Sequence, residues 1–284
     1  MSSHISRRDF LARAATIMAA MPRVAPGSHG ASDPLSLRIG VANLGSSPPD
    51  GHDMGLTLGV EEATHAAEMF GGSIELVPIA DKNFPGALSA VVGDSDYARC
   101  VALARAADAA GLPFLNVASS ADALRGAGCR RTMFHVAPSD AMYRDARSAA
   151  NVEGQSLAWH PSLVRFGADT LNKRFLARFN RPMTSEAWTA WLGVKILWES
   201  SLRARSAEPA QLMDYLTRDT TQFDGHKGVP LSFRPWDRQL RQPLYVSADS
   251  RVIEVPSDTS REGSRDLLDR LGVRKSDTSC RIAS

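Results

Sequence analysis

The chain has 284 residues, with 33 Lys and Arg against 31 Asp and Glu, which gives a formal net charge of +2. This balance offers no argument for nucleic-acid binding, and a hydrophobic content of 43% excludes a wholly disordered chain. The length allows one large domain or two smaller ones.

The N-terminal segment has the pattern of an export signal. Arg7 and Arg8 precede a short apolar run, Leu11 to Met21, in the manner of a twin-arginine signal. The run is too short to cross a bilayer, which needs roughly 20 apolar residues. A linker rich in Pro, Gly and Ser follows. We therefore expect residues 1–31 to be signal peptide and linker, and the mature protein to be periplasmic without a membrane span. The alternative is an amphipathic helix of the folded domain.

Strands and helices alternate along the first half of the chain. The expected strands are 35–44, 73–81, 87–94, 112–120 and 132–137, and the expected helices are 54–70, 95–110 and 121–125. Such alternation predicts βαβ units, and therefore an α/β fold with a parallel sheet and flanking helices.

The second half changes character and is mostly helical. The expected helices are 139–151, 161–179, 184–203, 209–217 and 261–271, and two late strands are expected at 242–248 and 251–256. Trp188, Trp191 and Trp198 share the third of these helices and are interpreted as helix core, not as a stacking platform.

Polar side chains at the ends of three expected strands are candidate ligand-binding residues: Asn43, Ser95, Ser119 and Ser120. Ligands of open parallel sheets bind outside the carboxyl ends of the strands, and helix N-termini there favour a carboxylate or another anion. Serine at such a position is most often a helix N-cap, so this alternative stays open.

Motifs for catalysis, cofactors and metals are absent from the sequence. It has no Gly-x-Ser-x-Gly elbow, phosphate loop, dinucleotide fingerprint or His-Glu-x-x-His. Glu61, Glu62, His65 and Glu68 form the best metal-like cluster, but a solvated helix face explains them. His135 is interpreted as a packed core histidine. We therefore expect no catalysis, no cofactor and no metal site.

The three cysteines leave the disulfide pairing open. Cys100 lies in an apolar helical run and is expected to be a buried thiol, whereas Cys129 and Cys280 lie in polar, loop-like sequence. An exported protein can form disulfides, but an odd number leaves one thiol over or pairs it between chains.

The stretch 232–246, SFRPWDRQLRQPLYV, gathers Arg234, Arg238 and Arg241 around Asp237. Arginine clusters suit oxyanions, so a phosphate site is one interpretation. The favoured interpretation is scaffold, with an ion-paired Asp237 and a turn anchored by aromatic side chains.

Several blocks of the sequence resemble a known family. FDGHKGVPLSF followed by QPLYV, and VVGDSDYARCVALARAADAAGLPFLNVASSADAL, resemble type I periplasmic solute-binding proteins of ABC transporters, of the branched-chain amino acid type. ADALRGAGCRRTMFHVAPSDAMYRDA, RPMTSEAWTAWLGVKILWES, KGVPLSFRPWDRQLRQPLYV and LLDRLGVRKSDTSCR resemble the binding protein associated with pyrroloquinoline quinone-dependent alcohol dehydrogenase systems.

This resemblance implies a function and partners. The partners would be a small-molecule ligand, an ABC permease and ATPase, and a periplasmic quinoprotein dehydrogenase. In the amino-acid binders such serine loops hold the amino and carboxylate ends of the ligand, a role carried here to Ser95, Ser119 and Ser120.

The chain departs from the family in its second lobe. The expected strands end near Ala137 and the returning helix starts near Glu186, too short an interval for a second α/β lobe, which usually takes about 100 residues. We expect an N-terminal lobe at 32–150, a reduced helical remnant at 151–183, and returning helices, late strands and tail at 184–284. Two functions stay open: a solute-binding component of an importer, and a non-transport protein that binds a periplasmic partner or is a degenerate copy.

Overall fold

The computed structural model describes residues 34–42, 44–45, 47–80, 84–93, 97–249, 251–256 and 264–282. Residues 34–284 belong to one compact unit. The expected export signal at residues 1–31 lies outside the described residues. None of the helices in the described ranges is long and apolar enough to cross a membrane.

A five-stranded parallel sheet forms the centre of this unit, which confirms the predicted fold class. Its strands are β1 (Ser36–Ala42), β2 (Ser73–Ile79), β3 (Ala90–Gly93), β4 (Phe114–Asn116) and β5 (Met133–His135). The spatial order is β2-β1-β3-β4-β5, and every neighbouring pair is parallel. β3, β4 and β5 are buried along their whole length, and β1 is buried from Ile39 to Ala42, as expected of strands covered by helices on both sides.

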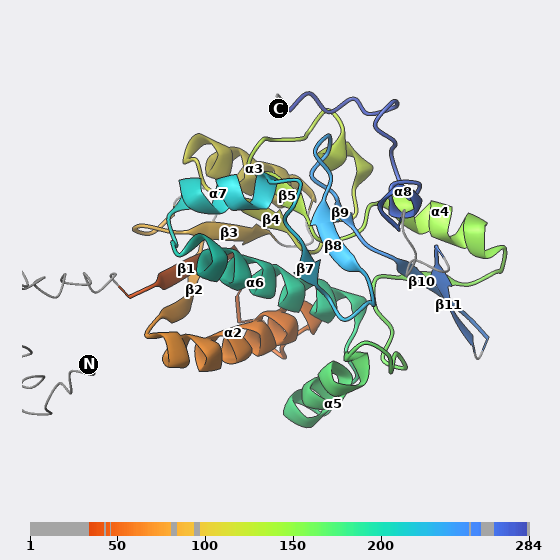
Figure 1. The fold of residues 1–284 in the computed structure, drawn as a ribbon, viewed down its shortest axis with the longest axis horizontal. Coiled ribbons are helices and arrows are strands. Elements are labelled where there is room, and N and C mark those ends of the chain that lie inside the picture. The colour runs from red at the N-terminus through yellow and green to blue at the C-terminus, as the bar shows by residue number, and fades with distance from the viewer. Residues whose placement is uncertain are drawn as a thin grey trace, which may run out of the picture. The chain divides into compact units, whose positions relative to one another are not determined.

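Helices cover both faces of the sheet (Figure 1). α2 (Gly51–Phe70) and α6 (Ser185–Ala204) pack on one face, and α3 (Tyr97–Ala109) packs on the other. Trp188, Trp191 and Trp198 of α6 belong to the first core, which confirms their prediction as helix core. The result is a three-layer α/β arrangement.

Three glycines bring α2 and α6 unusually close together. Gly51, Gly55 and Gly59 repeat at every fourth position and share one face of α2. A Cβ atom at Gly55 would lie 2.1 Å from the carbonyl oxygen of Ala187, and one at Gly59 would lie 2.9 Å from Cβ of Val194. Any larger residue at Gly55 would therefore push the two helices apart.

The described residues form no second parallel sheet between β5 and α6. Between β5 and α6 the described chain has only α4 (Asp140–Ala150), β6 (Gln155–Leu157) and α5 (Ala168–Phe179). The segment 151–183, expected to be helical, also contains β6. β6 joins β10 (Leu244–Ala248) and β11 (Arg251–Val255) in a small antiparallel sheet.

The C-terminal part closes the unit around the parallel sheet. Its elements are α7 (Pro209–Thr217), β7 (Phe223–Asp224), β8 (Pro230–Phe233), β9 (Leu240–Arg241) and α8 (Ser264–Leu268). α4 packs on the small sheet through a third core that includes Met142, Val246 and Leu271. The turn before β9 continues the parallel sheet locally, through a bridge between His135 and Gln239.

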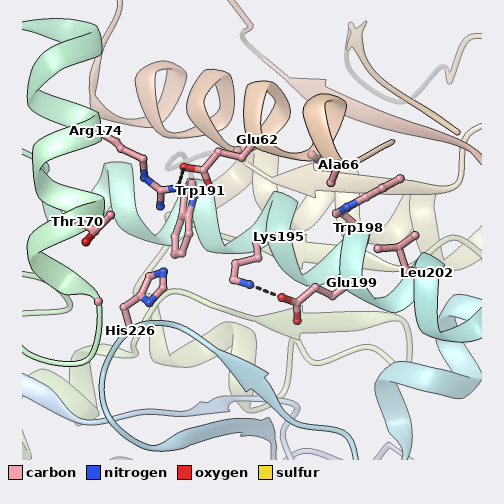
Figure 2. A pocket seen from close by; sticks show the side chains of 13 residues that line it. Glu62, Ala66, Thr170, Arg174, Trp191, Lys195, Trp198, Glu199, Leu202 and His226 are labelled. Carbon is pink, nitrogen blue, oxygen red and sulfur yellow. Dashed lines mark hydrogen bonds and ion pairs between the residues drawn. The ribbon is translucent and has the colours of Figure 1, made fainter. Parts of the chain in front are cut away.

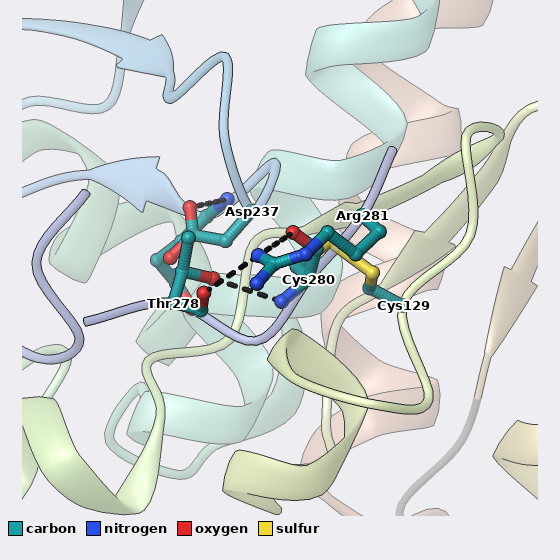
Figure 3. Close-up of a disulfide and its surroundings, with 6 residues drawn as sticks. Cys129, Asp237, Thr278, Cys280 and Arg281 are labelled. Atoms are coloured by element: carbon teal, nitrogen blue, oxygen red, sulfur yellow. Dashed lines mark hydrogen bonds between the residues drawn. A yellow bond between two sulfur atoms is a disulfide. The ribbon is translucent and has the colours of Figure 1, made fainter. Parts of the chain in front are cut away.

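A disulfide ties the tail to the loop after the short 3₁₀ helix η1 (Asp122–Arg125) (Figure 3). It joins Cys129 and Cys280, whose Cα atoms are 5.7 Å apart. Arg281 beside it donates hydrogen bonds to the carbonyl oxygens of Thr278 and Cys280. Cys100 is fully buried in α3, as predicted.

Candidate binding site

The structure describes two of the four residues expected at the strand ends. Ser119 and Ser120 lie in the loop after β4, whereas Asn43 and Ser95 lie outside the described residues. Ser119 is buried, with 5% of its surface exposed, and Ser120 is half-buried. The carbonyl oxygen of Ser120 accepts a hydrogen bond from the backbone N–H of Asp140 at 2.8 Å. The loop is therefore pinned to the start of α4.

Buried side chains already use the main-chain groups of this loop. The Asn116 side chain accepts from the N–H of Ser119 (2.9 Å) and donates to its carbonyl oxygen (2.7 Å). The buried guanidinium of Arg125 donates to the carbonyl oxygens of Ser119, Ala121 and Ala137 at 3.0, 3.1 and 2.6 Å. A ligand could use the main chain of Ser119 only by displacing these partners.

His135 is a neutral, packed histidine, as predicted. It is fully buried, and its Nδ1 accepts a hydrogen bond from the Asn116 amide at 3.1 Å. Burial, with a smaller contribution from the positive charge of Arg125, holds the pKa of His135 well below its ordinary value. His135 is thus part of the framework that holds the serine loop.

The arginine-rich stretch 232–246 is scaffold, as the favoured interpretation predicted. Arg234 and Arg241 each donate from Nε to the same carboxylate oxygen of Asp269, at 3.0 and 2.8 Å. Asp237 is buried 3.8 Å from Arg234, and burial raises its pKa although Arg234 opposes the shift. Because Arg234 and Asp237 are almost fully buried, an external phosphate cannot reach them.

Two glutamines of the same stretch form hydrogen bonds with the backbone at the carboxyl end of β5. Gln239 accepts from Arg125 at 2.9 Å and donates to the carbonyl oxygen of His135 at 3.1 Å. Gln242 donates to the carbonyl oxygen of Val136 at 2.7 Å and accepts from Lys227 at 2.9 Å. Protein groups therefore occupy the sheet edge beside Ser119.

A cavity of about 540 Å³ lies instead on the outer side of α2 and α6, and we call it the lateral groove (Figure 2). α5 and the turn at His226 close one end of it. Its floor is apolar and comes from Ala63 and Ala66 of α2 and from Trp198 and Leu202 of α6. The volume lies within the usual range for small-molecule sites, about 300–1,000 Å³.

Charged side chains border the lateral groove as ion pairs. Glu62 lies 3.1 Å from a guanidinium nitrogen of Arg174 and accepts a hydrogen bond from the Trp191 indole at 2.9 Å. Lys195 pairs with Glu199 one turn further along α6, and both side chains are about one-fifth exposed, at 24% and 20%. Figure 2 shows Lys195 and Trp191 projecting from α6 toward His226.

His226 forms the far wall of the lateral groove. Its ring stacks on Trp191 with centroids 5.6 Å apart and planes at 22°. Nδ1 lies 3.1 Å from the carbonyl oxygen of Phe166, which fixes Nδ1 as the donor in the neutral ring. A side chain at Gly167 would meet this nitrogen at 2.8 Å, and the φ of Gly167 is +87°. Glycine is therefore required where the chain passes His226.

The acidic side chains of the metal-like cluster, Glu61 and Glu62, bind arginines of α5 instead of gathering around one point. Arg178 of α5 binds the carboxylate of Glu61 with hydrogen bonds of 2.8 to 3.1 Å. Only His65 and Glu68 form a loose, exposed pair at 4.0 Å. The helix face is thus partly an interface with α5, not simply a solvated surface.

A second acidic group lies at the start of α2. Asp50, His52 and Asp53 have potential ligand atoms within 4.8 Å of one another. Asp50 caps the helix through the N–H of Asp53, and Asp53 accepts from the N–H of Gly45 at 3.4 Å. These contacts are structural.

Sequence reasoning missed the lateral groove because its walls come from distant segments. The spacing of Lys195 and Glu199, four residues apart on a helix, does indicate an ion pair. Nothing in the sequence indicates that Arg174 and His226 approach Trp191, because α5 and the turn at His226 are placed by tertiary packing.

Comparisons with known proteins identify the fold. No protein-family model and no curated protein matches the chain. A periplasmic binding protein from Burkholderia mallei is 12% identical, with a TM-score of 0.69 over 88% of this chain and 99% of that protein. A solute-binding protein of an ABC transporter from R. palustris, in complex with benzoate, is 12% identical, with a TM-score of 0.62 over 88% and 100%.

An ABC transporter substrate-binding protein from Desulfitobacterium hafniense, in complex with Leu, is 16% identical, with a TM-score of 0.62 over 78% of this chain and 100% of that protein. At these identities the likeness concerns the fold alone. The chain has the mixed α/β fold of type I periplasmic binding proteins, with a parallel central sheet and flanking helices.

Proposed function

We propose that the protein is a periplasmic substrate-binding component of an ABC-type importer, and that it binds a small organic solute without catalysis. The observation that carries this proposal is the fold, shared with binding proteins solved with benzoate and with leucine. The partners would be the permease and ATPase of the importer. The resemblance of the sequence blocks adds a link to a quinoprotein alcohol dehydrogenase system.

The same proposal covers the organisation of the chain. Residues 1–31 would direct export by the twin-arginine route, 32–150 would form the binding lobe, and 151–183 would stand where a second lobe is reduced. Residues 184–284 would return to complete the unit. Ser120, with Asn43 and Ser95, would contact solute at the strand ends; the burial of Ser119 makes its hydroxyl a weaker contact.

Thermal unfolding with a ligand panel tests solute binding. L-leucine, L-isoleucine, benzoate and short primary alcohols are added to the full-length protein. A ligand at 100 times its Kd stabilises the folded state by about 2.7 kcal/mol. For a chain of this size that raises Tm by roughly 5 to 11 °C. If no member of the panel, nor any small acid added to it, shifts Tm, the solute-binding proposal fails.

A second function, binding of a periplasmic protein partner, is favoured by one observation. Val164, Phe166 and Leu176 are 67%, 50% and 50% exposed, and all lie in the reduced segment before and within α5. Large apolar side chains grouped on a surface often mark protein contacts. Capture of a quinoprotein dehydrogenase from periplasmic extract, and its loss in a Val164→Ser/Leu176→Ser variant, would support this function. Equal capture by both proteins would count against it.

A further inference from the structure

The lateral groove is separate from the strand ends. Its walls come from the outer sides of α2 and α6, from α5 and from the turn at His226. The serine loop after β4 is instead held by Asn116 and Arg125. A ligand in the groove would therefore touch neither Ser119 nor Ser120, the two expected solute-binding residues that the structure describes.

The shape and lining of the groove suit a compact apolar body. Ala63 and Ala66 leave space where larger side chains would fill it, and Trp198 and Leu202 supply apolar surface. Trp191 is covered by His226, so a ligand would lie against the exposed side of the histidine ring and not between the two rings. Burial of apolar ligand atoms is the expected source of affinity here.

The polar groups of the groove favour a ligand that accepts hydrogen bonds. Both carboxylates are already in ion pairs, Glu62 with Arg174 and Glu199 with Lys195, and Glu62 also accepts a hydrogen bond from the Trp191 indole. A guanidinium has five N–H donors and an ammonium three, so the two ion pairs leave donors for a further acceptor. A ligand ammonium, in contrast, would compete with protein cations for the same carboxylates.

We propose that the lateral groove binds a small monocarboxylate that has an apolar body and no ammonium group. The carboxylate would lie beside Lys195 and Arg174, and the apolar body would lie on Ala66 and Trp198. This site goes beyond the proposed function, because it holds whether or not the strand ends bind a second solute.

Three probes of one carbon skeleton test the ligand class. They are 4-methylpentanoate, its neutral amide, and L-leucine, which differs from the acid by its ammonium group. Binding is measured by calorimetry and by the tryptophan fluorescence of the protein, since two of its five tryptophans, Trp191 and Trp198, line the groove. We expect the acid to bind about 10- to 100-fold more tightly than the amide, because charge-assisted hydrogen bonds are lost. L-leucine should also bind more weakly than the acid.

Two variants test the location, each with a matched control. Ala66→Phe should abolish binding of 4-methylpentanoate by filling the groove. Ala109→Phe makes the same change at an exposed site of α3, on the opposite face of the sheet, and should leave binding unchanged.

The second variant, Lys195→Gln/Glu199→Gln, removes both charges of one ion pair and should reduce the preference for acid over amide. Its control is Lys173→Gln/Asp169→Asn, an exposed pair on α5 with the same spacing. Because this variant leaves the volume of the groove nearly unchanged, it keeps the test valid if Ala66→Phe does not fold.

The outcomes separate this site from the proposed function. The inference is overturned if 4-methylpentanoate does not bind, if L-leucine binds as tightly, or if both groove variants bind like their controls. If binding instead disappears in Ser120→Ala, the solute lies at the strand ends, so solute binding stands and the groove does not. If the groove binds the acid but the protein supports no uptake through an ABC permease, the transport function fails and the groove inference stands.

Discussion

Replacing Asp269 with Asn should destabilise the protein strongly, because one carboxylate oxygen serves two buried arginines. Arg234 is completely buried and Arg241 is 7% exposed, and both donate to Oδ1 of Asp269 at 3.0 and 2.8 Å. Breaking a buried ion pair by removing one partner costs about 3–5 kcal/mol. Asp269 is itself 23% exposed and Asp237 still faces Arg234, so we expect the lower end, about 3 kcal/mol.

Urea denaturation and thermal unfolding measure this loss. About 3 kcal/mol corresponds to a decrease in Tm of roughly 6 to 12 °C for a chain of this size. Asp266→Asn makes the same change at an exposed aspartate of α8 and should stay within about 0.5 kcal/mol of the wild type. If Asp269→Asn lowers the free energy of unfolding no more than Asp266→Asn does, the ion pairs of Asp269 with Arg234 and Arg241 do not stabilise the arginine-rich stretch.

Three further predictions concern the framework. Reduction of the disulfide between Cys129 and Cys280, 151 residues apart, should lower the urea midpoint. Loop entropy sets an upper bound of about 5 kcal/mol, and a Cys129→Ala/Cys280→Ala variant should show no response to reductant. Gly55→Ala should lower stability by roughly 1–3 kcal/mol, because its Cβ would lie 2.1 Å from the Ala187 oxygen. A gain in stability, as expected of Ala in an uncrowded helix, would contradict the close packing of α2 and α6.

The third concerns pH. Because burial lowers the pKa of His135 below 6.5, the unfolded state binds more protons than the folded state below that pH. The free energy of unfolding should therefore decrease as pH falls from 6.5. Urea midpoints measured at pH 7.5 and 5.5 should differ less in His135→Gln than in the wild type, and equal differences would refute the assignment.

The elements with strong local signals were predictable from the sequence. The five parallel strands and the helices at α2, α3 and α6 follow from apolar runs, caps and glycine stops, which depend on neighbours in the chain. The lack of further parallel strands between β5 and α6 in the described chain was also predictable, because the sequence there shows no alternation of strands and helices.

Elements that depend on distant partners were missed. β6 has three residues and no alternating pattern; it is a strand because β10 pairs with it. The helix expected at 161–179 begins only at Ala168, since Phe166 has a φ of +57° and Gly167 a φ of +87°. Tertiary contacts at His226 impose this break.

The sheet edge at the carboxyl ends of β4 and β5 bears on the question of where a ligand binds. Arg125, Gln239 and Gln242 donate hydrogen bonds to carbonyl oxygens at the ends of β4 and β5. These backbone acceptors are therefore satisfied by side chains of the same compact unit. A single lobe without this network would expose or orphan those groups.

The stretch 232–246 thus fills the sheet edge at the carboxyl ends of β4 and β5, the place where open parallel sheets bind ligands. Solute binding at the β4 loop would then require Asn116 or Arg125 to release the main-chain groups of Ser119. The lateral groove requires no such opening, because its ion pairs and apolar floor are already formed. Of the two places, the groove is the one at which binding would cost the least rearrangement.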